Sequence, residues 1–104
     1  MTQLESCLLL DRLPGIGAQR CIKLLLHFGN ASAIFGAKPR EWKRVPGIGT
    51  LASKKLATWR EYEDQVKQAI EGLKKHKVKY LFFGSEGYPL PLSYCPDAPL
   101  ILFY

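Results

Sequence analysis

The sequence predicts a mainly α-helical fold that ends in a few short β-strands. Two observations carry this prediction. The segment Leu13–Gly17, which reads Leu-Pro-Gly-Ile-Gly, returns as Val45–Gly49 with its proline 32 positions later, and residues with helical periodicity follow each copy. From residue 78 onward the pattern changes to short apolar runs separated by glycine and proline, which is typical of strands and turns.

Size and composition bound the function classes. A chain of 104 residues with 47% hydrophobic content supports one modest core. Fifteen Lys and Arg against nine acids give a net charge of +6, which favours a polyanionic partner without requiring one. The three cysteines lack metal-ligand spacing, and no cofactor motif, export signal or membrane-spanning stretch is found. We therefore predict no metal, no cofactor and no membrane partner, and a cytoplasmic location.

The first helix is predicted from Gln3 to about Leu13. Thr2 and Glu5 have the spacing of a capping box, in which the threonine side chain satisfies a free amide at the helix start. Pro14 ends the helix, because a proline disfavours helical geometry in the residue before it.

Three further helices are predicted before the second copy of the repeat. Residues 18–28 place apolar side chains at intervals of three and four, and Gly29 suits the end of that helix. Asn30 can cap a short helix over residues 31–35. Proline fits the first turn of a helix over residues 39–45.

The second copy leads into the longest helical region, Leu51–His76, with a possible break near Arg60. Strands are predicted at Lys79–Phe83 and Pro99–Tyr104, with a turn-rich loop at Gly84–Pro91 between them. These elements divide the chain into a helical domain and the start of another.

We place the boundary between these domains after residue 77, so that residues 1–77 form the helical domain and residues 78–104 the incomplete start of a second. Two short strands make a poor sheet alone, and an uncovered apolar edge promotes aggregation. We therefore expect the chain to be the front part of a longer protein.

The repeated glycine segments predict phosphate-binding hairpins. Glycine adopts positive φ and permits close backbone approach, so Gly-Ile-Gly can turn the chain between two helices while the isoleucine fills the gap between them. Free amides at the start of the next helix can then hold a phosphate. This is the helix-hairpin-helix pattern, and two tandem copies resemble the paired, SAM-like module of many DNA-binding proteins. The resemblance implies that each hairpin holds the backbone of one strand.

The predicted DNA-binding residues are Gly15, Ile16, Gly17, Arg20 and Lys23 in the first repeat and Gly47, Ile48, Gly49, Thr50, Lys54 and Lys55 in the second. Glycines and isoleucines supply backbone amides, lysines and arginine supply charge, and the threonine supplies a hydroxyl. In the alternative interpretation both turns only connect packed helices. The other basic runs, at residues 38–44 and 74–79, are interpreted as solvated helix faces, and both tryptophans as core.

No catalytic residue is predicted. Gly-Ile-Gly lacks the preceding strand and the third glycine of a dinucleotide fingerprint, and no P-loop follows it. A base-excision enzyme would need a hairpin lysine with a buried acid, and Lys54 with Asp64 hardly reproduces that arrangement. We therefore expect weak backbone binding without sequence preference and without catalysis. A protein-docking module with purely structural hairpins is the alternative.

Five segments in order resemble the N-terminal region of the DNA-processing protein A family (DprA, also called Smf): Leu10–Gly17, His27–Gly29, Val45–Gly49, Phe83–Leu92 and Pro96–Tyr104. The resemblance implies a SAM-like helical domain followed by a Rossmann-like domain, truncated here. It also implies single-stranded DNA as partner, with duplex DNA as an alternative, and RecA as a partner of the full-length protein. The implied role is recombination during natural transformation, or competence, with the main DNA pocket in the missing domain.

Overall fold

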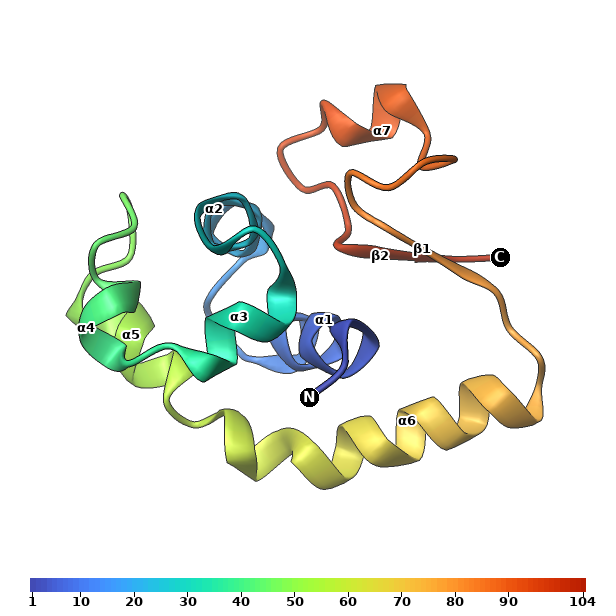
Figure 1. Cartoon of the computed structure of the whole chain (residues 1–104), viewed down its shortest axis with the longest axis horizontal. Coiled ribbons are helices and arrows are strands. Elements are labelled where there is room, and N and C mark those ends of the chain that lie inside the picture. Colours follow the sequence, from blue (N-terminus) through green and yellow to red (C-terminus); the bar gives the residue numbers. More distant parts are fainter.

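The computed structural model describes all 104 residues, and the chain is mainly helical (Figure 1). Its elements are α1 (Gln3–Arg12), α2 (Ala18–Phe28), α3 (Ala31–Gly36), α4 (Pro39–Trp42), α5 (Thr50–Leu56), the 3-10 helix η1 (Trp59–Tyr62), α6 (Glu63–Lys75), β1 (Tyr80–Phe82), α7 (Leu90–Ser93) and β2 (Ile101–Phe103). In Figure 1, α6 runs along the lower edge and the strands with α7 form the upper right. None of the helices is both long and apolar enough to cross a membrane.

The predicted helix starts are confirmed by their caps. The Thr2 hydroxyl oxygen accepts a hydrogen bond from the Glu5 backbone N–H at 3.1 Å, and the Asn30 side-chain oxygen accepts one from the Ala33 N–H at 2.9 Å. Gly29 ends α2 with φ of 85°, which is a conformation that favours glycine. These signals act within four residues, so the local sequence suffices to predict them.

One helical prediction was wrong in extent, and the predicted break in another helical region is confirmed. The fourth helix ends at Trp42 rather than Val45, because Val45 donates its N–H to the Trp42 carbonyl in a tight turn and precedes a proline. The helical region predicted over Leu51–His76 is divided into α5, η1 and α6, which confirms the break predicted near Arg60. There the Thr58 hydroxyl donates to the Lys55 carbonyl at 2.7 Å, a local side-chain bond that competes with helical continuation.

The second half also contains a helical turn that was not predicted. The loop predicted over Gly84–Pro91 ends earlier, because α7 begins at Leu90. Pro91 fits its first turn, and the Ser93 hydroxyl donates to the Leu90 carbonyl at 2.6 Å. A single turn of this kind leaves no periodicity in the sequence.

The two predicted strands are confirmed as a short antiparallel pair. Leu81 lies opposite Leu102, with Tyr80 opposite Phe103 and Phe82 opposite Ile101. Phe82 continues into Phe83, whose N–H donates to the Leu100 carbonyl at 2.8 Å. Two antiparallel strands do not define a Rossmann-like sheet, so that part of the fold prediction stays a prediction.

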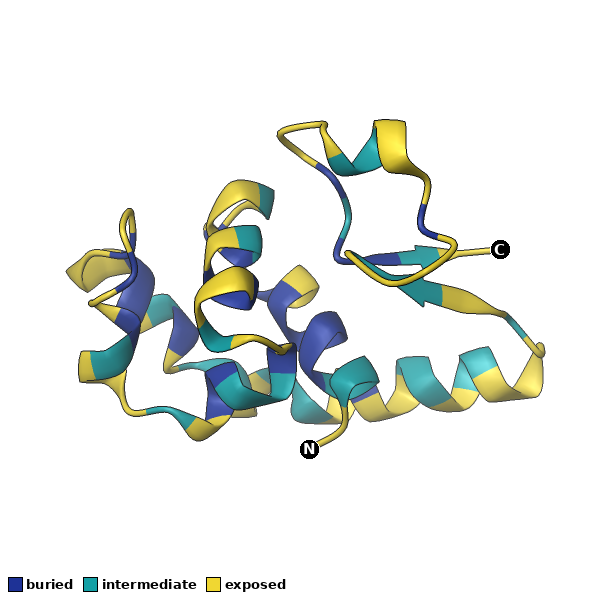
Figure 2. Cartoon of the chain, turned by 45° about the horizontal axis from the view of Figure 1, so that its top comes forward, coloured by how far each residue is buried: buried dark blue, intermediate teal, exposed yellow.

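One apolar core holds the helices and the end of the chain together. Its most enclosed side chains include Leu24, Ile34 and Leu56, each fully buried. Leu100 and Ile101 belong to the same cluster. Figure 2 shows buried residues concentrated in the helices around α1, while α7 is exposed or half-buried. The helices and β2 therefore share a core across the predicted domain boundary, which itself stays a prediction.

Two buried cysteines, Cys7 and Cys21, make the stability of the fold fall at alkaline pH. Burial, with a smaller contribution from the Cys21 thiolate, raises the pKa of Cys7 from 9.0 to about 12, and burial, with Asp11, raises that of Cys21 from 9.0 to about 11. The folded state holds both protons more tightly than the unfolded state. Its stability is therefore complete below pH 9 and falls as the pH rises from 9 toward 11 to 12.

We expect the free energy of unfolding to fall by about 1 kcal/mol per thiol per pH unit above pH 9. Urea unfolding at pH 8 and pH 10 in a reducing buffer measures this loss. The free energy of unfolding of the double variant Cys7→Ala/Cys21→Ala should fall less between the two pH values. In Cys95→Ala, which changes an exposed cysteine, it should fall as much as in the unchanged chain. An equal loss in all three proteins would contradict the assignment to the buried thiols.

Candidate nucleic-acid interface

The two glycine hairpins have the geometry that the sequence predicts at their centres. Gly15 and Gly47 have φ of 79° and 89°, so each turn depends on a residue without a Cβ atom. Ile16 and Ile48 are 1% and 3% exposed and fill the space between helices. Their side chains cannot touch a ligand, which leaves only their backbone groups for binding.

The second glycines of the two hairpins differ. Gly17 has φ of 83° and ψ of 156°, a region that essentially only glycine occupies. Gly49 has φ of −94° and ψ of −167°, which is extended backbone open to any residue. Both precede a helix whose first turn contains no acid and whose start has no side-chain cap. The repeat is therefore symmetric in sequence but not in backbone geometry.

This difference predicts unequal effects of the same substitution. Gly17→Ala is expected to lower the free energy of unfolding by about 2 kcal/mol, because alanine is strained at that φ and ψ. Gly49→Ala is expected to cost less than about 1 kcal/mol, and nothing lies within 4 Å of the added Cβ at either site. Urea unfolding of both variants compares the two costs, and equal costs would contradict the geometry.

Each hairpin is approached by a lysine from the other repeat. The ammonium group of Lys55, on α5, lies against Gly15, where an added Cβ would collide with it. The Nζ atom of Lys23, on α2, lies 3.3 Å from the position that a Cβ would take at Gly47. The two lysines are 32 positions apart, as the hairpins are, so they occupy equivalent places in the repeat. The exchange brings the two hairpins side by side.

Arg20 connects the two hairpins directly. Its Nε donates to the Gly47 carbonyl at 3.1 Å, and its Nη1 donates to the Ile16 carbonyl at 3.3 Å. A guanidinium has five N–H donors, so most of them remain free on this exposed side chain. Arg20 therefore both fixes the spacing of the hairpins and offers charge at their junction.

Two hollows in the surface meet at Arg20. The first, of about 470 Å³, is lined by residues 16–20, Lys23, Gly47, Pro96 and Asp97. The second, of about 310 Å³, is lined by Gly15, Arg20, Gly47, Gly49, Leu51, Ala52 and Lys55. Arg20 and Gly47 line both. Together the hollows present backbone, two lysines, one arginine and one acid, Asp97, on one surface.

Most predicted site residues come together here, and three do not. Thr50 and Lys54 are exposed on α5 but line neither hollow, and the buried Ile48 lines neither hollow. Sequence reasoning missed Pro96 and Asp97 as neighbours of the first hairpin. They lie about 80 positions away along the chain, and no pattern in the sequence indicates that contact.

Comparison with known proteins gives short matches to one kind of protein. The UvrABC system protein C of Alcanivorax borkumensis is 42% identical over 50 residues, which are 48% of this chain and 8% of the relative. That of Symbiobacterium thermophilum is 43% identical over 63 residues, which are 61% of this chain and 8% of the relative. That of Dichelobacter nodosus is 48% identical over 40 residues, which are 38% of this chain and 7% of the relative.

The chain therefore spans less than a tenth of the length of these relatives. No family model matches it, and no solved structure matches it. The resemblance to the DNA-processing protein A family, drawn from the sequence motifs, receives no support from these matches. What the comparisons establish is similarity, over about half of this chain, to short segments of UvrABC system protein C.

Proposed function

We propose that this chain is a non-enzymatic DNA-binding module of a DNA-processing protein, and that the paired hairpins hold the phosphodiester backbone. One observation carries the proposal: Lys23 and Lys55 each lie against the glycine hairpin of the other repeat. With Arg20 bonded to both hairpins, this exchange gathers three cations beside exposed backbone. Such a surface suits successive phosphates of a nucleic acid.

The lining of the hollows favours backbone contact over base recognition. Glycine, alanine, lysine and arginine dominate it, and no aromatic side chain is present for a base to stack on. Ile16 and Ile48 are turned into the core. We therefore expect binding without sequence preference.

The similarity to segments of UvrABC system protein C supports a role in DNA processing. A narrower proposal is the N-terminal accessory module of a DprA-type protein that binds single-stranded DNA and assists RecA in natural transformation. It rests on the motif resemblance alone. In that proposal the contact with RecA belongs to the full-length protein, and a Rossmann-like domain supplies the main DNA pocket.

Titration of a labelled single-stranded oligonucleotide at several salt concentrations tests the proposed function. Three phosphate contacts predict a slope of about −2 in log K against log salt, at about −0.7 per neutralised phosphate. Random-sequence and homopolymer oligonucleotides should bind alike. Absence of binding at low salt, or affinity independent of salt, would contradict the proposal.

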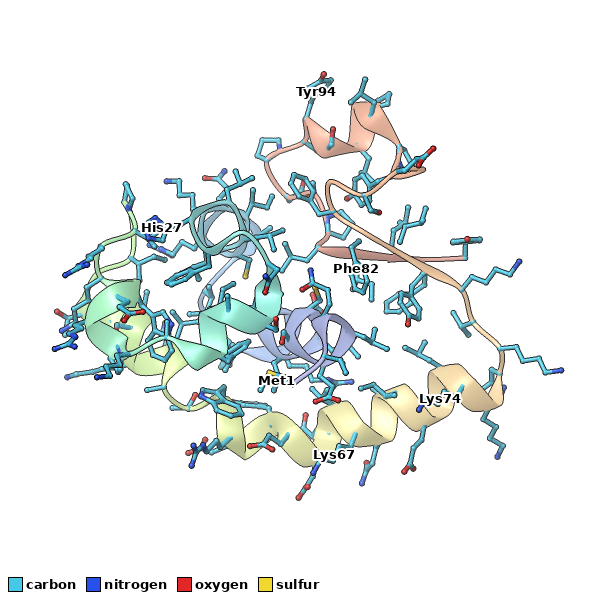
Figure 3. The ribbon with its side chains drawn as sticks, viewed as in Figure 1. Met1, His27, Lys67, Lys74, Phe82 and Tyr94 are labelled. Carbon is cyan, nitrogen blue, oxygen red and sulfur yellow. The ribbon has the colours of Figure 1, made fainter.

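A specific observation also favours a second candidate, a protein-docking function. Tyr94, directly after α7, is 76% exposed. At the strand pair, Tyr104 is 67% exposed, and Phe103 and Tyr80, which lie opposite each other, are also exposed. Figure 3 shows Tyr94 at the outer edge of the α7 region. If docking is the function, Tyr94→Ser should weaken partner capture while hairpin variants leave it unchanged, and the reverse pattern would contradict it.

A further inference from the structure

The two repeats carry different charges beside equivalent hairpins. Residues 6–12, before the first hairpin, hold one acid and one arginine, whereas the equivalent residues 38–44 hold four cations and one acid. Asp11 is replaced at the equivalent position by Lys43. In the helices that follow, Lys54 stands where the first repeat has Ile22. Lys43 and Lys54 are both exposed.

A second carboxylate is brought to the first hairpin by the end of the chain. Asp97 lines the larger hollow, which residues 16–20 of the first repeat form together with Lys23 and Gly47. Asp97 and Asp11 also line a neighbouring hollow of about 200 Å³ that again includes Gly17. The other hollow beside Arg20 has no acid in its lining, and apart from Gly15 and Arg20 it is lined by the second repeat. Two acids thus flank the first hairpin.

Asp97 is held in this place by the fold. The next residue, Ala98, is 1% exposed and donates its N–H to the Cys95 carbonyl at 3.1 Å. The Tyr88 hydroxyl donates to the Pro99 carbonyl at 2.7 Å, which ties the same loop to the preceding segment. The backbone that carries Asp97 is therefore anchored beside the first hairpin, and the Asp97 side chain is exposed there.

These charges act on a bound phosphate over short range. At physiological salt the Debye length is about 8 Å, so groups lining the same hollow are only partly screened from each other. A phosphate at the first hairpin meets Asp11 and Asp97 as well as Arg20 and Lys55. A phosphate at the second hairpin meets Arg20 and Lys23. In the sequence, Lys43 and Arg44 stand directly before this turn, where the first repeat has Asp11 and Arg12.

We propose that the second hairpin is the primary phosphate contact and that Asp11 and Asp97 keep the first hairpin a weak one. This inference rests on the proposed function and deepens it. The two sides of the surface then bind with different strength. A polyanion is held mainly on the Val45–Gly49 side, and the two acids weaken its binding on the Leu13–Gly17 side. Asp11 and Asp97 tune affinity without being required for it.

The repeat supplies a matched pair for the test, because Arg12 and Arg44 occupy equivalent positions, are both exposed, and can receive the same substitution. Arg44→Gln is expected to weaken binding of a labelled oligonucleotide about threefold, and Arg12→Gln by less than about 1.5-fold. Asp97→Asn is expected to strengthen binding about threefold, against little change in Asp64→Asn, which removes the same charge on α6.

All four variants are compared with the unchanged chain by fluorescence anisotropy at one fixed low salt concentration. Equal losses in the two arginine variants, or equal gains in the two aspartate variants, would overturn the inference while leaving the proposed function standing. Absence of binding by the unchanged chain would overturn both.

Discussion

The double variant Lys23→Glu/Lys55→Glu is expected to bind a single-stranded oligonucleotide about 100-fold more weakly than the unchanged chain at low salt. Each substitution removes a cation from a hairpin and places a carboxylate there that repels the phosphates. Each is expected to weaken the affinity for the oligonucleotide about tenfold. Because Lys23 lies at Gly47 and Lys55 at Gly15, the pair damages both hairpins at once. Fluorescence anisotropy with a labelled oligonucleotide measures the loss.

The control for this experiment is Lys67→Glu/Lys74→Glu. Both lysines are exposed on α6, and Figure 3 shows them along the lower edge of the molecule. This variant makes the same change in net charge, so it reports the non-specific effect of charge alone. Equal loss of affinity in the two double variants would contradict a site at the hairpins. Far-ultraviolet circular dichroism confirms that each variant is folded.

Trp42→Ala is expected to have the largest effect on stability, lowering the free energy of unfolding by about 3 to 5 kcal/mol. The indole is 3% exposed, and its Nε1 donates to the Ile34 carbonyl at 2.7 Å. The substitution leaves a cavity and an unpaired buried carbonyl. Domains of this size are stable by about 5 to 15 kcal/mol, so the loss is a large share of the total. Urea unfolding followed by circular dichroism measures it.

Two controls separate the contributions. Trp42→Phe keeps most of the volume and loses the hydrogen bond, so it should cost distinctly less than Trp42→Ala. Trp59→Ala removes a half-buried ring that packs on Phe35 and lies beneath Arg60, and it should also cost less. A loss at residue 59 as large as that at residue 42 would contradict the assignment of Trp42 to the core.

Elements decided by neighbouring residues were predictable from the sequence. The Thr2 and Asn30 caps, the turns at Gly15 and Gly47 and the burial of the hairpin isoleucines all follow from interactions within a few positions. The early end of α4 and the turn at α7 were missed because each helix has only four residues, which is too short for a periodic pattern of apolar residues.

The arrangement of the candidate site could be predicted only in part. The sequence placed Lys23 and Lys55 near their own hairpins, whereas the structure places each against the other hairpin. The bond from Arg20 to Gly47 spans 27 positions, and the approach of Asp97 to Gly17 spans about 80. Contacts of that separation depend on how the helices pack, which periodicity and motif spacing do not specify.

The lysine exchange has the arrangement of a two-fold symmetric dimer. In such a dimer, residue i of one subunit contacts residue j of the other, and residue j of the first subunit contacts residue i of the second. Here one chain contains both halves. A homodimer of a single repeat would have to carry identical charges on its two sides. Fusing the halves into one chain removes that constraint, so Asp11 and Lys43 can differ at equivalent positions. Two repeats in one chain thus keep the reciprocal contact of an isologous interface while allowing its two sides to diverge.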